Sequence, residues 1–206
     1  GLNPELEMGR FLTDVAAYKH CVPVAGSLEY VAADGQTWTL ALLQAQVANQ
    51  GDAWTSTVDH LAKTLETIGA GHSTPDEDFG ALTDSMRMLA RRVAELHLAL
   101  AQRSGRPAFE PEPVQAADTA RWKDVVRKEC HRTLAQLRER TEPWPAPLGD
   151  EVARITAAEP ALMQVIDRVG AVPASHMKTR LHGDLHLGQV LVCRDDFLII
   201  DFEGEP

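Results

Sequence analysis

Apolar residues between positions 82 and 100 recur at alternating steps of four and three, the spacing of one buried face on a long α-helix. Thr74 and Pro75 are helix-start signals, Glu77 can complete a capping box with Thr74, and the pattern stops near Gly105. The sequence therefore predicts a long helix between these points. Its predicted buried face consists of Leu82, Met86, Leu89, Val93, Leu96 and Leu100.

Two segments with strand character precede this helix. Residues 26–31 and 37–43 have strand-like patterns, and Ala33-Asp34-Gly35 between them indicates a hairpin. Before them, Asn3 and Pro4 open a short amphipathic helix, with a capping residue and a proline in the first turn.

A second helix and a second hairpin follow the long helix. Residues 118–140 have a helical pattern, and shorter helical pieces continue to about Val169. Residues 189–193 and 197–201 predict two strands, with Asp195 and Asp196 serving only as turn residues between them. The order of strand pair, helical block and strand pair predicts an α+β fold. The predicted inward residues of the second helix are Trp122, Val125, Val126, Cys130, Leu134 and Leu137.

Charge and composition exclude several classes of protein. The formal net charge of −10, with no long basic run, argues against a nucleic-acid partner, because phosphate backbones demand clustered Lys and Arg. No apolar run is long enough to span a bilayer and no secretory leader is present, so we expect a cytoplasmic protein without a membrane partner. Cys21, Cys130 and Cys193 show no CxxC spacing, so we expect free thiols.

Oxygen-bearing side chains gather at the second hairpin. Asp184 and Gln189 stand at the two ends of one loop, and Asp201 and Glu203 follow the last strand. If the backbone there is extended, the side chains of Asp201 and Glu203 project on the same side. Carboxylate and amide oxygens are the ligands that Mg²⁺ prefers, with phosphates and water completing its shell.

The spacing of Asp184, Gln189 and Asp201 is typical of a site that transfers phosphoryl groups. Such a site needs a metal to neutralise the phosphates and a carboxylate to orient the attacking hydroxyl and accept its proton. The spacing matches the kinase pattern His-x-Asp-x-x-x-x-Asn followed by Asp-Phe-Gly. Gln189 stands in place of the asparagine and Glu203 in place of the glycine. His182-Gly183-Asp184 resembles the aminoglycoside-phosphotransferase branch of the kinase-like proteins, which acts on small molecules.

Residues 182–206 resemble the signature of the maltokinase family, including its forms fused to trehalose synthase. The resemblance extends to residues 3–12, 26–30, 47–54 and 94–100. It implies a protein-kinase-like (aminoglycoside phosphotransferase-like) bilobal α+β fold. Residues 1–48 would be a remnant of the β-rich N-lobe and residues 49–206 the mostly helical C-lobe.

The same resemblance implies the reaction and the roles of the loop residues. ATP and Mg²⁺ would be the cofactors, and the γ-phosphoryl group would pass to maltose to give maltose 1-phosphate. Asp184 would be the catalytic base, Gln189 and Asp201 the Mg²⁺ ligands, and Glu203 a carboxylate for a second metal ion or beside the first. His182 would brace the loop backbone and take no part in proton transfer.

Three further residues take nucleotide-binding roles from the resemblance. Gln46 and Val47 would lie at the hinge that meets adenine through backbone groups, and Glu7 would pair with the ATP-binding lysine. A phosphate-covering loop and that lysine are not found before Glu7, so we expect a truncated chain. Without the lysine, a solvated position near a helix start is an equally good interpretation of Glu7.

Three other functions share some of these sequence features. A glucosamine kinase, or a kinase for another small molecule, has the same fold and metal loop, and the loop does not choose the sugar. A metallophosphoesterase also uses Gly-Asp-x-His, but its upstream Asp-x-His and downstream Asn-His-Asp or Asn-His-Glu are missing. An inactive kinase-like binding module is disfavoured because all four oxygen-bearing residues are retained. His97 on the long helix is expected to be a core or interface histidine.

Overall fold

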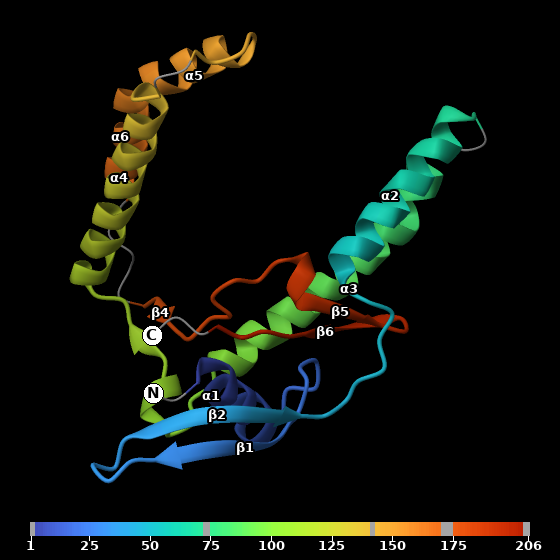
Figure 1. Cartoon of the computed structure of the whole chain (residues 1–206), viewed down its shortest axis with the longest axis vertical. Helices are drawn as coiled ribbons and strands as arrows, with labels where there is room; N and C mark the ends of the chain where they lie inside the picture. Colours follow the sequence, from blue (N-terminus) through green and yellow to red (C-terminus); the bar gives the residue numbers. More distant parts are fainter. Residues whose placement is uncertain (1–2, 72–74, 141–142, 170–174, 204–206) are drawn as a thin grey trace. The chain divides into compact units, whose positions relative to one another are not determined.

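The computed structural model describes residues 3–71, 75–140, 143–169 and 175–203 (Figure 1). The chain divides into two compact units: residues 1–111 together with 179–206 form the first, and residues 112–178 form the second. The predicted lobe boundary near residue 48 lies within the first unit, and this division does not decide it, so it stays a prediction. None of the described helices is both long and apolar enough to cross a membrane.

The first unit begins with the predicted helix, α1 (Pro4–Arg10). The Asn3 side chain caps it by accepting a hydrogen bond of 3.1 Å from the Leu6 amide. The helix runs directly into a wider π-helical turn, η1 (Phe11–Val15). Met8, Phe11 and Leu12 are fully buried and belong to one of the core clusters of the unit.

The first predicted hairpin is present as two antiparallel strands, β1 (Val24–Val31) and β2 (Thr37–Gln44). Tyr30 lies opposite Trp38, with their ring centroids 6.0 Å apart, which is within the range of a cross-strand aromatic pair. The turn between the strands closes with a hydrogen bond of 2.9 Å from the Gly35 amide to the Ala32 carbonyl.

Two long helices follow, α2 (Ala53–Gly69) and α3 (Pro75–Leu100). The predicted face of α3 is buried or half-buried along its whole length, so this prediction is confirmed. Thr74 and the side chain of Glu77 lie outside the described residues, so the predicted capping box stays a prediction. His97 is exposed, so the core position among the two expected for it is wrong, and an interface position stays a prediction; the core takes in Leu96 and Leu100 instead.

The second predicted hairpin consists of β5 (Val190–Cys193) and β6 (Asp196–Ile199), and it lies beside α3 in Figure 1. Two short 3₁₀ turns complete the unit, η2 (Pro107–Phe109) and η3 (Leu187–Gln189), so Gln189 ends a turn and does not begin a strand. One face of the hairpin is buried among residues of α1, α2 and α3; its buried residues are Val190, Phe197 and Ile199.

Asp196 at the start of β6 is more than a turn residue. Its carboxylate accepts two hydrogen bonds of 2.7 Å from Nε and Nη2 of Arg92, on α3. Arg92 also donates to Glu95, and the Asp196 carboxylate accepts from the Phe197 amide. The Arg92 guanidinium, helped by that amide, lowers the pKa of Asp196 below its ordinary value. This fork-like pair ties the hairpin to the long helix.

The second unit contains the helices α4 (Ala116–Arg138), α5 (Leu148–Ala157) and α6 (Glu159–Arg168). Its short strands β3 (Glu112–Pro113) and β4 (Met177–Lys178) pair antiparallel. Leu134 of α4 is buried as predicted, whereas Trp122, Val125 and Val126 are exposed. Their predicted inward position is not seen within this unit, because an apolar pattern identifies a face of a helix without supplying an element that covers it.

We expect Asp196→Asn to lower the unfolding free energy of the full-length protein at pH 7 by about 1–2 kcal/mol, because solvent reaches part of the ion pair and weakens it. The folded-state pKa of Asp196 lies below the unfolded value of 3.8. The difference in unfolding free energy between wild type and variant should therefore be fully present above the unfolded pKa, and it should disappear as the pH falls through the folded-state pKa. Urea unfolding at several pH values measures it. Asp195→Asn, at the exposed neighbour, is the control and should leave stability unchanged; an equal effect at both positions would contradict the role of Asp196.

Candidate active site

His182 anchors the loop that carries Asp184. The His182 ring is buried, and its Nε2 lies 2.8 Å from the Ile200 carbonyl. Because a carbonyl only accepts, Nε2 carries the proton, and Nδ1 is the acceptor for the Asp184 amide at 3.4 Å. The ring therefore joins the Asp184 loop to the segment that leads to Asp201. Gly183, between His182 and Asp184, has φ +100°, a conformation that favours glycine.

The Asp184 carboxylate is exposed, and His186 is the charged or polar side chain that approaches it. The distance from His186 Nε2 to Asp184 Oδ2 is 3.7 Å. His186 Nδ1 accepts a hydrogen bond of 3.0 Å from the Gly188 amide, which leaves the proton on the nitrogen that faces Asp184. The side chain at position 188 is therefore restricted: a Cβ there would lie 2.7 Å from His186 Cε1.

Gln189 and Asp201 meet directly. Gln189 Nε2 donates a hydrogen bond of 2.7 Å to Asp201 Oδ2, and the Ile200 amide donates one of 3.0 Å to the Gln189 carbonyl. Gln189 Oε1 and Asp201 Oδ1 have no partner among the described residues. The structure thus brings the two predicted metal ligands together and leaves one oxygen of each available.

Glu203 does not join this pair. Asp201 has φ +61°, in the left-handed region, so the backbone is not extended there and the condition for Asp201 and Glu203 to share one side is not met. Phe202 between them is buried, with its ring 4.8 Å from that of His182, whereas Glu203 is exposed. Among residues whose positions are described, no group of three or more His, Cys, Asp or Glu side chains converges as a metal site. Glu205 lies outside the described residues.

The predicted hinge lies in the extended segment between β2 and α2. Gln46 is exposed, and the Val47 carbonyl accepts a hydrogen bond of 3.1 Å from the Asn49 side chain. The segment is tied to β5 further along: the Gln50 amide donates to the Val192 carbonyl at 2.8 Å, and the Val192 amide to the Gly51 carbonyl at 2.9 Å. These bonds place Gln50 and Gly51, a few residues after the predicted hinge, beside β5. The hinge role of Gln46 and Val47 stays a prediction.

Glu7 has a cationic partner that sequence reasoning missed. Its Oε2 accepts a hydrogen bond of 2.8 Å from Nη2 of Arg180, and the two side chains are 27% and 17% exposed. Glu7 is therefore not a solvated surface carboxylate. The one available signal was Arg180 itself, a charged residue two positions before His182.

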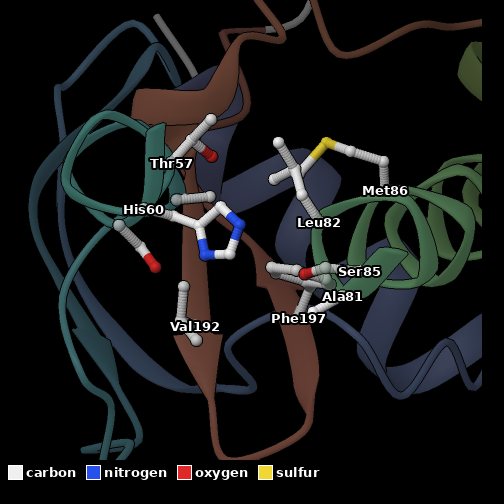
Figure 2. A pocket seen from close by; sticks show the side chains of 10 residues that line it. Thr57, His60, Ala81, Leu82, Ser85, Met86, Val192 and Phe197 are labelled. Carbon is white, nitrogen blue, oxygen red and sulfur yellow. The ribbon is translucent and has the colours of Figure 1, made fainter. Parts of the chain in front are cut away.

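A small cavity of about 140 Å³ lies elsewhere, between α2, α3 and the β5–β6 hairpin. Figure 2 shows the His60 ring projecting from α2 into this space, with Leu82, Ser85 and Met86 of α3 beside it. His60 Nε2 is buried without a partner among the described residues, and a cavity of this size and polarity has room for water. None of the predicted site residues lines it.

Comparisons with known proteins find similarity between this chain and enzymes that phosphorylate sugars. No family model matches the chain. Over 185 residues, or 90% of its length, the chain is 28% identical to a glucosamine kinase of Streptacidiphilus jiangxiensis, of which the match covers 36%. It also superposes on a solved glucosamine kinase structure, crystal form B, with a TM-score of 0.69 and 25% identity, over 99% of this chain and 42% of that one.

The similarity is thus to small-sugar kinases with a kinase-like fold. The finer resemblance to maltokinases, with maltose as acceptor and trehalose synthase as a fused partner, finds no support in these comparisons. The chain spans less than half of the length of each of these two relatives.

Gly188→Ala should displace the His186 ring and break its bond to the Gly188 amide. We expect a loss of about 1 kcal/mol in the free energy of unfolding, the net contribution of one such hydrogen bond. Gly80→Ala is the matched control. Gly80 lies on α3, and a Cβ at this position would have no atom within 4 Å. This control should raise stability by about 0.5–1 kcal/mol, because alanine favours the helix. Urea unfolding of both variants measures the difference, and effects of the same sign would refute the assigned contact.

Proposed function

We propose that this chain is part of an ATP-dependent sugar kinase that transfers the γ-phosphoryl group of ATP to glucosamine. The observation that carries the proposal is the contact between Gln189 and Asp201, next to the loop that presents Asp184. The similarity to two glucosamine kinases supports both the class of reaction and the acceptor. ATP and Mg²⁺ follow from the class.

The donor atoms at this contact fit Mg²⁺. Gln189 Oε1 and Asp201 Oδ1 are hard oxygen donors without a competing partner among the described residues. Asp201 and Gln189 would hold the ion, and the ion when bound would supply charge neutralisation to the phosphates. Glu203, which is exposed and separate from the pair, is the weaker candidate ligand.

Asp184 is the proposed base for the acceptor hydroxyl. Its exposed carboxylate is open to a substrate, and its backbone is held by His182, which is itself bonded to the Ile200 carbonyl. The base and the metal ligands are therefore connected through one buried ring. Positioning of this kind is the main contribution that a protein makes to phosphoryl transfer.

The acceptor is the point where the resemblance to maltokinases and the comparisons differ. The resemblance of residues 182–206 to maltokinases favours maltose. The sequence also has no acidic cluster beside the loop, beyond Glu203 and Glu205, that would attract an ammonium group. That argument counts charge only near the metal loop, and more than half of each relative's length lies outside the match. We therefore give the similarity to glucosamine kinases more weight than the local charge count.

A kinetic panel on the full-length protein tests the acceptor. With ATP and Mg²⁺, kcat/KM for glucosamine should exceed that for maltose and glucose by at least about 100-fold, because a site built for the amino group leaves polar groups unpaired with the other sugars. If maltose is the best acceptor, glucosamine is the wrong substrate and the kinase assignment stands. If no sugar is phosphorylated, the proposed function is wrong.

Two isosteric variants separate the base from the metal site. Asp184→Asn should lower kcat by about 10²–10⁴-fold with little change in ATP affinity, since a positioned general base contributes that much. Asp201→Asn should instead raise the Mg²⁺ concentration needed for half-maximal activity, and asparagine tolerates the left-handed backbone that Asp201 adopts. Kinetics over a range of Mg²⁺ concentrations distinguish the two. A Mg²⁺ dependence that is normal in Asp201→Asn would exclude this site.

A further inference from the structure

Arg180 lies where three segments distant in the sequence meet. Its guanidinium donates to Glu7 on α1, a residue 173 positions away, at 2.8 Å. The same guanidinium lies over the Phe109 ring of η2, 5.1 Å from its centroid. Two residues further along the chain is His182. Arg180 is thus in contact with α1 and η2 at the entrance to the loop that carries Asp184.

A pair of aromatic rings forms a second connection between Arg180 and α1. Phe109 stacks on Phe11, with the ring centroids 3.9 Å apart and the planes inclined by 1°, and both rings are buried. Phe11 continues α1 into η1. Arg180 therefore meets α1 both through the Glu7 carboxylate and through the Phe109–Phe11 stack.

Towards the C-terminus, Arg180 is connected through His182 to the loop that carries Asp184. His182 is bonded through Nε2 to the Ile200 carbonyl and through Nδ1 to the Asp184 amide. A displacement of Arg180 along the chain would move His182, and with it the backbone at Asp184 and next to Asp201.

Stability alone is a poor explanation for this pair. Arg180 Nε is buried without a hydrogen-bond partner among the described residues. A partly desolvated ion pair with an unmet hydrogen-bond donor is often no more stabilising than apolar side chains of the same volume. What the pair adds is a directional bond between α1 and the loop.

We propose that Arg180 is a positioning residue, whose ion pair with Glu7 sets the position of the Asp184 loop relative to α1. The inference rests on the proposed function, and it gives Glu7 a second role besides any contact with a nucleotide-binding lysine. Oε2 holds Arg180, and Oε1 stays open to a further cation.

The test uses the full-length protein with Arg180→Met, Arg180→Lys, Glu7→Gln and the Arg180→Met/Glu7→Gln double variant. Arg106→Gln is the matched control, since Arg106 lies beside Glu7 and Phe109 but is exposed and its side chain has no partner among the described residues. The measurements are kcat, KM for ATP and for the sugar, and amide hydrogen exchange over residues 182–189.

We expect Arg180→Met to lower kcat at least about 10-fold with KM for the sugar nearly unchanged, because small displacements of catalytic groups are costly. The double variant should be no worse than the single ones, since the two residues act as a unit. Arg180→Lys should recover part of kcat, Arg106→Gln should match wild type, and amide exchange over residues 182–189 should rise in Arg180→Met but not in the control.

Two results would overturn the proposal. One is an Arg180→Met protein with wild-type kcat and wild-type exchange in the loop; the other is strict additivity of the Glu7 and Arg180 effects on exchange. If Arg180→Met fails to fold, Arg180→Lys and Glu7→Gln carry the same comparison. A wild-type protein that phosphorylates no sugar refutes the proposed function only, because exchange in the loop still decides whether Arg180 positions it.

Discussion

The burial of one face of the β5–β6 hairpin against the helices of the first unit is the constraint on which the candidate site depends. Val190, Phe197 and Ile199 are almost completely buried, next to Leu89 and Leu96 of α3. Gln189 precedes this hairpin and Asp201 follows it, so the pairing of the two strands brings Gln189 and Asp201 into contact. The Arg92–Asp196 pair adds direction to an apolar contact that has none of its own.

On each side of the hairpin, one residue has a positive φ angle, which glycine adopts readily and aspartate adopts at a cost in energy. Asp201 has φ +61° and Gly183 has φ +100°. A non-glycine residue in the left-handed region persists only when its surroundings hold it there. The neighbours of Asp201 do so: Phe202 is buried against His182, and the Ile200 carbonyl accepts the His182 proton. With the backbone in this conformation, the Asp201 carboxylate contacts Gln189 and does not share one side of the chain with Glu203.

Local signals in the sequence predicted the helices and strands. They failed to predict features that depend on contacts between distant parts of the chain. The apolar face of α3, the cap of α1 and both hairpins depend on neighbouring residues, and each is found. Trp122 on α4 was misplaced because periodicity shows which face is apolar without showing what covers it. The roles of Asp196 and Arg180 were missed because their partners lie 104 and 173 positions away. The conformation of Asp201 depends on the packing of its neighbours, which no motif encodes.

The acceptor sugar is hard to predict from the sequence for a different physical reason. Asp184, Gln189 and Asp201 are suited to a phosphate, a metal ion and a hydroxyl, and these three are common to every reaction in which ATP phosphorylates a sugar. A selective enzyme discriminates through contacts made with one acceptor and left unsatisfied by another. Such contacts involve the parts of the sugar that do not react, so the residues that make them need not lie near the metal loop. A motif centred on that loop therefore indicates phosphoryl transfer without indicating a particular sugar, and similarity over 90% of the chain is the stronger guide to the acceptor.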